Sequence, residues 1–331
     1  MVYTVSYITE KERQNRTMKR IFFLGLTAIL LLLVCSCSID TNKTDEEKIS
    51  IVTTIFPTYD FSKNIVGELG EVTLLLKPGE ESHSYEPTPQ DIIKIQSCDV
   101  FVYVGGMSDA WVETLLRSID TSKIKLVTLL DCVSLIENVG GHQHNDENEH
   151  NGVYDEHIWT SPKNAVKMTK RISEAIISAD SENVESYKKN TEKYIEELDE
   201  LDSIFSDIVE NKVLDTIIVG DRFPFIYLTK EYGINYFSAF DSCSDESEVS
   251  ASTVAELVEE TKKRNIKIVF QIEMSSGRIA DSIASETVAE VRLLHSCNNI
   301  SRDEWESGET YISLMKNNAK VLKEALGSKD K

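Results

Sequence analysis

Basic residues and histidines are scarce in this sequence. Its 35 lysines and arginines stand against 56 aspartates and glutamates, which gives a formal charge of −21 at pH 7. This balance argues against a nucleic-acid-binding protein, because a phosphate-binding face needs clustered Lys and Arg. The hydrolase motifs H-E-x-x-H and G-x-S-x-G are absent, which argues against a secreted zinc-dependent hydrolase. Only six histidines occur, so any cluster of them is informative.

The longest apolar run, Ile21–Val34, is too short for a comfortable transmembrane helix. It follows Met18-Lys19-Arg20 and therefore predicts a signal peptide over residues 1–36, with translation starting at Met18. The run ends in Val-Cys-Ser-Cys, which resembles a bacterial lipobox with Cys37 as the lipidated residue, followed by a polar tether over 37–48. The alternative is an uncleaved membrane anchor. Both interpretations place the rest of the chain outside the cytoplasm.

Beyond Cys35 and Cys37 the chain has four cysteines, an even number, and whether Cys98 and Cys132 are bridged stays open. Cys98 and Cys132 adjoin apolar segments and are expected to be small buried residues. Cys243 and Cys297 both come just after predicted strands, in an oxidising compartment, so a bridge between them is predicted.

Strands and helices alternate along the chain, which predicts an α/β fold with parallel sheets flanked by helices. Two similar lobes are expected, at residues 49–181 and 212–331, joined by one long rigid linker helix over 182–211. The predicted strands are 51–56, 72–77, 100–104 and 125–130 in the first lobe, and 216–220, 234–240, 267–272 and 291–295 in the second. The linker carries an apolar stripe formed by Tyr187, Tyr194, Leu198, Leu201, Phe205 and Ile208.

Four of the six histidines fall in the window 140–162. His142, His144 and His150 lie among Gly, Asn, Asp and Glu, a composition that predicts a mobile loop over 140–157 that collects cations. His157 comes where this loop gives way to Ile-Trp and Ser-Pro. Imidazole combined with carboxylate suits Zn²⁺ and its neighbours. The alternative for the loop is a solvated polar insertion.

Further candidates follow other strands, at the sheet edge where ligands bind in parallel α/β folds. His83 follows the strand 72–77, Glu273 follows 267–272, and His295 closes 291–295. Together with His157 they predict a metal site in a cleft between the lobes. The histidines could instead be surface or packed residues. Glu273 has a further alternative, an ion pair with Arg222 or Arg278.

Several motifs resemble one protein family: ESHSYEPTPQDI around His83, VFVYVGG at 100–106, DEHIWTSPKNA around His157, FIYLTKEYGI at 225–234, and IADSIASET after Glu273. The sequence is similar, over nearly all of the mature chain, to the metal-binding lipoproteins of bacterial ABC importers. It most resembles the zinc members of the zinc and manganese class, which have a helical linker. The resemblance implies a protein that is not an enzyme and that captures Zn²⁺ with high affinity in the inter-lobe cleft.

The resemblance also implies partners and ligands. The partners are an ABC permease with its ATPase and, through the lipid anchor, the membrane; a monomer is expected, with no nucleic acid. The metal ligands carried over are His83, His157, His295 and Glu273, with Asp221 as an alternative fourth. The chain departs from the family at Arg222, where His or Glu is usual, because a guanidinium cannot ligate.

Three other functions stay open at this point: a manganese-binding member of the same class, a surface adhesin, and a secreted zinc-dependent hydrolase. Three imidazoles and one carboxylate favour zinc over manganese, which prefers oxygen ligands. The loop histidines His142, His144 and His150 are expected to collect zinc weakly and pass it to the site.

Overall fold

The structure is a computed structural model of the 331-residue chain, and it describes residues 48–81, 85–137, 154–240 and 249–327. The predicted signal peptide, the tether and Cys37 lie outside these residues. The other candidates outside them are His83, His142, His144, His150 and Cys243. The predictions about these residues stay predictions.

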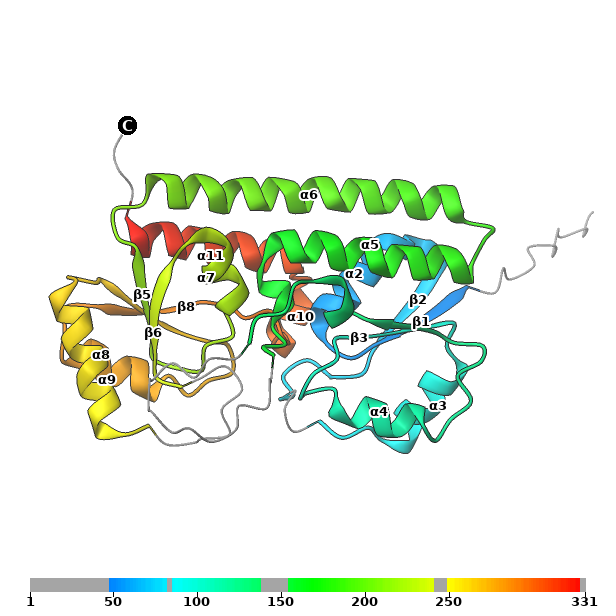
Figure 1. Ribbon diagram of the computed structural model, residues 1–331, viewed down its shortest axis with the longest axis horizontal. Helices are drawn as coiled ribbons and strands as arrows, with labels where there is room; N and C mark the ends of the chain where they lie inside the picture. Colours follow the sequence, from blue (N-terminus) through cyan, green and yellow to red (C-terminus); the bar gives the residue numbers. More distant parts are fainter. Residues whose placement is uncertain (1–47, 82–84, 138–153, 241–248, 328–331) are drawn as a thin grey trace, which may run out of the picture. The chain divides into compact units, whose positions relative to one another are not determined.

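The first four strands form a parallel sheet in the order β2-β1-β3-β4 (Figure 1). Ile51 and Val52 of β1 and Phe101 and Val102 of β3 are fully or almost fully buried. Continuous apolar strands of this kind are typical of a sheet covered on both faces. The elements are β1 (Ile49–Thr53), α2 (Phe56–Val66), η1 (Gly67–Leu69), β2 (Gly70–Leu74), α3 (Pro89–Ser97), β3 (Val100–Tyr103), α4 (Ala110–Leu116), β4 (Lys125–Thr128) and η3 (Leu130–Cys132).

The second sheet repeats this topology in the order β6-β5-β7-β8, again with parallel pairing. The predicted fold, two parallel-sheet lobes flanked by helices, is therefore confirmed. Its elements are β5 (Thr216–Val219), α7 (Ile226–Tyr232), β6 (Asn235–Ser238), α8 (Ala251–Lys263), β7 (Ile268–Gln271), α9 (Arg278–Ser285), β8 (Glu290–Leu293), α10 (Arg302–Ser307) and α11 (Tyr311–Leu326).

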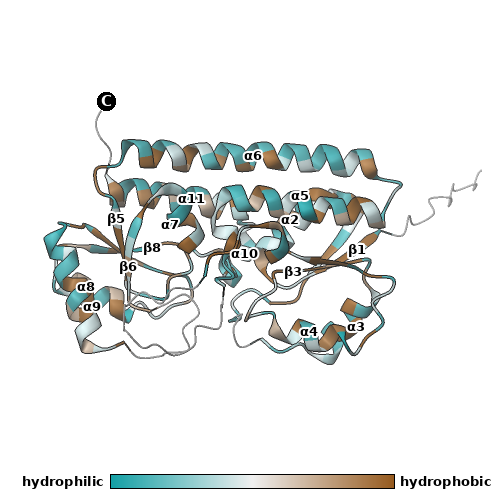
Figure 2. Ribbon diagram, viewed as in Figure 1, coloured by the Kyte–Doolittle hydropathy of each residue, from teal (hydrophilic) through white to brown (hydrophobic). Residues whose placement is uncertain are grey.

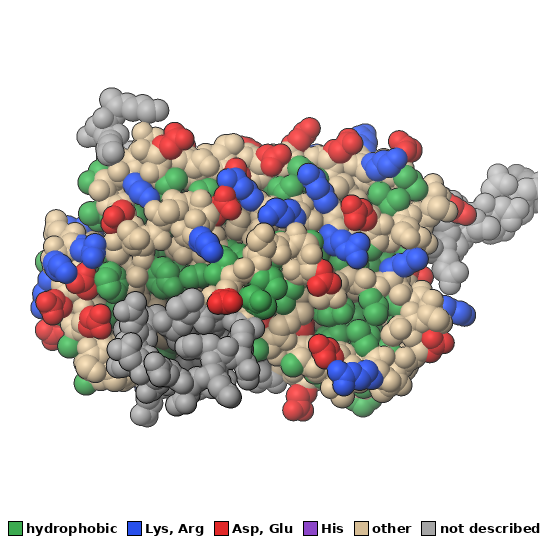
Figure 3. All heavy atoms as spheres, in the orientation of Figure 1, with side chains coloured by type: hydrophobic (Ala, Val, Ile, Leu, Met, Phe, Trp, Pro, Cys, Tyr) green, Lys and Arg blue, Asp and Glu red, His purple; other side chains and the backbone are tan. Residues whose placement is uncertain are grey.

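Between the sheets the chain forms η4 (Ile158–Thr160), α5 (Pro162–Ala179) and the 28-residue helix α6 (Val184–Asn211). The helix α6 packs on α2 and α5 of the first lobe and on α7 and α11 of the second (Figure 1). All six residues of the predicted apolar stripe are buried. Figure 2 shows α6 as a mostly hydrophilic helix with scattered hydrophobic segments, and acidic and basic side chains are interspersed over this side of the molecule (Figure 3).

One hydrophobic core runs through both lobes. It includes Ile51 of the first sheet, Leu198 and Phe205 of α6, and Ile217 and Phe270 of the second sheet. No helix in the described ranges is both long enough and apolar enough to cross a membrane. The shared core makes α6 a rigid connection rather than a hinge.

Two helices of the second half have clear start signals. The helix α7 begins at Ile226, just after Pro224, which disfavours a helical conformation in Phe223 before it. The short helix α10 was not predicted, although Ser301 and Glu304 form a capping box at its start and Gly308 ends it in the left-handed conformation. That start signal was readable in the sequence.

The stripe on α6 generates a stability prediction. Leu198 is fully buried, so Leu198→Ala is expected to lower the free energy of unfolding by about 2–5 kcal/mol. Glu196→Ala, at an exposed position of the same helix, is the matched control and should change it by less than about 0.5 kcal/mol. Urea unfolding of the metal-free protein measures both. Equal effects of the two substitutions would contradict the packing described here.

A buried carboxylate lies under the same helix. Asp60 Oδ2 accepts a hydrogen bond from the Tyr194 hydroxyl at 2.8 Å and one from Asn64 Nδ2 at 3.3 Å. Burial raises the pKa of Asp60 to about 6, which outweighs the opposing effect of the Tyr194 hydrogen bond. The folded state therefore binds this proton more tightly than the unfolded chain does. The contribution of Asp60 to stability is present below pH ~4 and is lost as the pH rises through about 6.

The substitution Asp60→Asn removes this charge at similar volume. Because only the wild type loses stability as Asp60 ionises, the free energy of unfolding of Asp60→Asn minus that of the wild type is expected to rise between pH ~4 and about 6. The rise should be at most about 3 kcal/mol, and the difference should stay constant at higher pH. Denaturant unfolding at several pH values measures the difference, with the exposed Asp199→Asn on α6 as control. A difference that does not change with pH would show that Asp60 titrates normally.

Candidate metal centre

Loops from both halves of the chain line a narrow pocket of about 40 Å³. Glu273 comes from the loop after β7, Ser296 from the loop after β8, and His157 from the segment that leads into α5. The carboxyl ends of parallel strands share one edge, which brings the first two loops together. The lining residues are Glu81, His157, Arg222, Pro224, Ile272, Glu273, Met274, Ser296 and Asn298. The volume suits one ion, since a water molecule occupies roughly 30 Å³.

A buried carboxylate orients the imidazole of His157. Its Nδ1 lies 3.1 Å from Asp155 Oδ1, and the same oxygen accepts the backbone N–H of His157 at 2.9 Å. Burial lowers the pKa of His157, but the carboxylates of Asp155, Glu156 and Glu273 together raise it more, with Asp155 foremost among them, so the net pKa is raised. A carboxylate at Nδ1 fixes the ring and makes Nε2 the nitrogen suited to a metal. Asp155 was not predicted, although a carboxylate two residues before a candidate ligand was a readable signal.

The segment that carries His157 is bonded to the second lobe. Trp159 Nε1 donates to the backbone carbonyl of Ser296 at 2.8 Å, and the Tyr311 hydroxyl donates to the carbonyl of Trp159 at 2.6 Å. The Tyr227 hydroxyl donates to the carbonyl of Asp155 at 2.8 Å. His157 therefore belongs to the first half of the sequence but is positioned by the second.

The carboxylate of Glu273 is held by a neighbouring loop. It accepts the backbone N–H of Ser296 at 2.7 Å and a short hydrogen bond from the Ser296 hydroxyl. Its carboxylate thus turns toward Ser296 instead of forming the ion pair with Arg222 or Arg278 that was the alternative. Met274 follows in the left-handed conformation, with φ 56°, which is unusual for a residue with a side chain. The backbone is strained where it presents Glu273 to the pocket.

His295 lies behind this pocket and is 2% exposed. Its Nδ1 accepts the backbone N–H of Cys297 at 2.9 Å and lies 3.8 Å from Glu273 Oε1. Its Nε2 has no hydrogen bond among the described residues and lies 3.5 Å from Glu304 Oε1, a distance that we interpret as electrostatic. The structure therefore brings His295 next to Glu273 but does not place it on the wall of the narrow pocket.

The cysteine near this site is a buried free thiol. Cys297 is fully buried and adopts φ 61°, and its sulfur lies 3.7 Å from the carbonyl oxygen of His295. A free thiol at Cys297 does not support the predicted disulfide with Cys243. Because Cys243 lies outside the described residues, that disulfide stays a prediction. Of the other two cysteines that the structure describes, Cys98 is buried, as predicted, and Cys132 is half-buried instead of buried.

The loop after β8 also contacts the first lobe beside the chain that leads to His83. Asn299 Nδ2 donates to the carbonyls of Lys77 and Glu80, at 2.8 Å each, and the backbone N–H of Gly79 donates to Ile300 at 2.8 Å. His83 itself lies outside the described residues. The described segment nearest to it ends at Glu81, which lines the narrow pocket.

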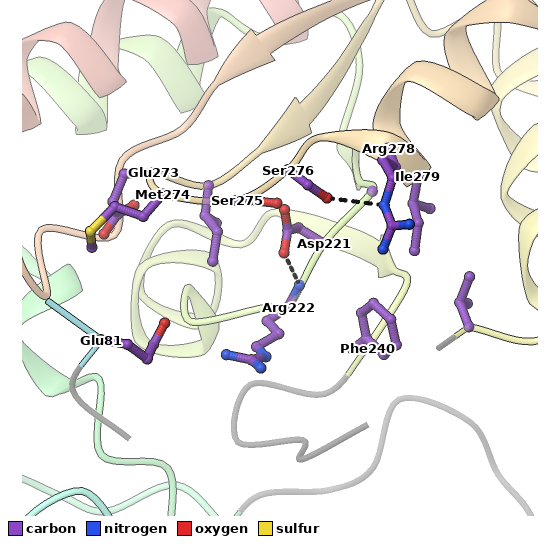
Figure 4. Close-up of a pocket in the computed structure, with 13 residues that line it drawn as sticks. Glu81, Asp221, Arg222, Phe240, Glu273, Met274, Ser275, Ser276, Arg278 and Ile279 are labelled. Carbon is purple, nitrogen blue, oxygen red and sulfur yellow. Dashed lines mark hydrogen bonds between the residues drawn. The ribbon is translucent and has the colours of Figure 1, made fainter. Parts of the chain in front are cut away.

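Asp221 and Arg222, from the loop after β5, line a larger neighbouring cavity (Figure 4). Asp221 Oδ1 accepts the backbone N–H of Arg222 at 2.9 Å, while Oδ2 is buried without a hydrogen-bond partner among the described residues. Burial raises the pKa of Asp221. The alternative ligand Asp221 thus does not share the narrow pocket with His157 and Glu273, whereas Arg222 does.

A family model described as zinc-uptake complex component A, periplasmic (ZnuA), matches residues 51–325. The chain belongs to this family. The predicted resemblance to the zinc members is thereby confirmed.

Individual relatives of this ZnuA-family protein agree. The high-affinity zinc uptake system protein ZnuA of Bacillus subtilis is 34% identical over 317 residues, which is 92% of this chain and 97% of the relative. The zinc-binding lipoprotein AdcA of Streptococcus pneumoniae is 32% identical over 311 residues, 93% of this chain but 61% of AdcA. This chain therefore spans about three fifths of the length of that relative. The crystal structure of the Zn(II)-bound ZnuA-like domain of AdcA superposes with a TM-score of 0.71 at 30% identity, covering 84% of this chain and 99% of that domain.

Within the part of the chain that the structure describes, this ZnuA-family protein has no group of three or more His, Cys, Asp and Glu side chains close enough to hold one metal ion. Two predicted ligands, His157 and Glu273, line one pocket. Two donors fall short of the four that zinc takes in closed sites.

The contact between Asp155 and His157 generates a prediction for the metal-free protein. Asp155→Asn is expected to lower the pKa of His157, because the carboxylate that raises it is removed while the burial that lowers it remains. NMR titration of the imidazole resonances measures this change. The exposed Asp281→Asn is the control and should leave the titration unchanged. A His157 pKa equal to that of the wild type in Asp155→Asn would contradict the role of this contact.

Proposed function

We propose that this protein binds Zn²⁺ outside the cytoplasm, in the pocket between its lobes, and delivers the ion to the permease of an ABC importer. The observation that supports this best is the narrow pocket with the buried His157 and the Glu273 carboxylate at the shared sheet edge. Family membership and the zinc-binding names of the relatives support it further. A pocket sized for one ion fits capture of an ion better than conversion of an organic substrate.

His83, His157, His295 and Glu273 are the proposed ligands. His83 is two residues from Glu81, which lines the pocket, and this closeness in the chain supports it as a ligand. For His295 to ligate through Nδ1, it has to give up the hydrogen bond from Cys297. The other role open to His295 is to position Glu273, whose Oε1 lies 3.8 Å from His295 Nδ1, without binding the metal itself. Substitution of His295 separates these two roles. Imidazoles with one carboxylate form a set that suits Zn²⁺, whereas Mn²⁺ prefers oxygen ligands.

Delivery to a permease requires the protein to stay at the membrane. We propose a diacyl anchor on Cys37, since a single acyl chain binds a bilayer only marginally. The tether over 37–48 then gives a monomeric protein reach to the permease, which in turn works with its ATPase. The loop histidines His142, His144 and His150 are proposed to collect zinc at low affinity. They keep ions near the tight site without becoming ligands of that site.

Zinc affinity of the purified metal-free protein tests the ligand assignment. His157→Ala and Glu273→Gln are each expected to weaken zinc binding by roughly a hundredfold or more, because a four-coordinate site loses one of its donors. Each metal-free variant is first checked for folding, because His157 is buried against Asp155. Competition with a fluorescent zinc chelator measures the affinities, and Glu286→Gln, exposed in the same lobe, is the matched control.

Two further variants refine the result. His295→Ala should lose as much affinity as His157→Ala if His295 ligates, and clearly less if it only supports Glu273. Deleting residues 141–152 should leave the tight site and remove weak zinc equivalents. Unchanged zinc affinity in both His157→Ala and Glu273→Gln would refute the proposed site.

A further inference from the structure

The backbone of His295 is clamped by the helix α11. The backbone N–H of His295 donates to Asn318 Oδ1 at 2.8 Å, and Asn318 Nδ2 donates to the carbonyl of His295 at 2.7 Å. Both residues are buried. These two hydrogen bonds fix the point from which the imidazole extends, so its orientation depends on the groups beside its two ring nitrogens.

The contact at Nδ1 indicates which ring nitrogen carries the proton of the neutral imidazole. His295 Nδ1 accepts the backbone N–H of Cys297 at 2.9 Å, so this nitrogen holds a lone pair. A neutral imidazole has one N–H, which therefore lies on Nε2. The metal-free protein thus already has, at Nδ1, the lone pair that a zinc ligand needs. Zinc binding there replaces the N–H of Cys297 and requires no exchange of the proton between the ring nitrogens.

The proton on Nε2 lies beside one carboxylate. His295 Nε2 is buried without a hydrogen bond among the described residues, and Glu304 Oε1 lies 3.5 Å from it. A buried N–H without an acceptor is unfavourable, whereas a nearby carboxylate stabilises the proton on the nitrogen that it faces. Glu304 therefore favours the form of the ring that leaves Nδ1 available to a metal.

The carboxylate of Glu304 is itself held in place. Its Oε2 accepts the backbone N–H of Ser301 at 2.8 Å and the Ser301 hydroxyl at 2.7 Å, in the capping box at the start of α10. These two bonds use one oxygen of the carboxylate and leave Oε1 for His295. The capping box thus accounts for the position of Oε2 and fixes the direction in which Oε1 points.

Resting on the proposed zinc function, in which His295 is a ligand, we propose that Glu304 is a positioning residue for zinc binding. Its Oε1 holds the proton of His295 on Nε2, so that Nδ1 presents its lone pair to the ion, and Glu304 itself does not touch the metal. A carboxylate at the far nitrogen of a metal-bound imidazole also makes that imidazole a stronger donor. Loss of such a partner typically weakens metal binding by about 10–100-fold.

A cycle of single and double substitutions tests this role in the full mature chain. Glu304→Gln should weaken zinc binding by roughly 10–100-fold. Its amide oxygen can still accept from Ser301, but the group turned toward the Nε2 proton is then an NH₂, which is a donor. In a His295→Ala background the same substitution should cost no further affinity, because Glu304 acts through His295. Competition with a fluorescent zinc chelator measures all affinities, and Glu306→Gln, exposed on α10, is the matched control that should bind like the wild type.

A second measurement needs no variant at position 304. The ¹⁵N NMR spectrum of the zinc-loaded wild type should show His295 with Nδ1 bound to the metal and a proton on Nε2. Comparison with the spectrum of His295→Ala assigns these resonances. A metal-bound Nε2 with a proton on Nδ1 overturns the proposal, even if Glu304→Gln does not fold.

The remaining outcomes separate this inference from the proposed function. Wild-type affinity in Glu304→Gln, with weakened binding in His295→Ala, refutes the role of Glu304 and leaves the ligand assignment standing. Losses that add in the double variant, or an equal loss in Glu306→Gln, also refute it, because the effect then does not pass through His295. Unchanged affinity in His295→Ala removes the ligand on which the role depends, while zinc binding by the protein stands. A wild type that does not bind zinc refutes the proposed function itself.

Discussion

The hydrogen bond from the Trp159 indole to the carbonyl of Ser296 is the contact on which the rest of the site depends. It joins the segment that carries His157 to the loop that holds Glu273, and Tyr311 strengthens it by donating to the carbonyl of Trp159. All three groups are buried, so breaking the contact would leave polar atoms without partners in the core. The two halves of the chain therefore meet at a fixed geometry instead of sliding past each other.

The shared core adds to this constraint. The helix α6 buries one stripe against helices of both lobes, and the same hydrophobic cluster continues into each sheet. A rigid connection of this kind allows only small closure around a ligand. In the proposed zinc site, His157 is already oriented by Asp155 and Glu273 is already held by Ser296. Preformed ligands avoid much of the ordering entropy that a flexible site has to overcome.

Arg222 lines the narrow pocket and brings a positive charge to it. A guanidinium repels a cation, so Arg222 is the least expected side chain at the proposed zinc site. The neighbouring Asp221 has a buried carboxyl oxygen without a hydrogen-bond partner among the described residues.

The sequence by itself determined the fold, because the periodicity of apolar residues and the alternation of strands and helices are local patterns that can be read directly along the chain. The stripe on α6 and both parallel sheets followed from it, and so did the position of His157 and Glu273 at one sheet edge. Only the tertiary structure decided how side chains at that edge are oriented. Asp155 holds one imidazole, Cys297 holds the other, and Arg222 faces a cavity. Asp155 and Cys297 each lie two residues from the histidine they contact, but the segments that carry these pairs are positioned by contacts between distant parts of the chain, such as Trp159 with Ser296. No local pattern encodes contacts of that kind.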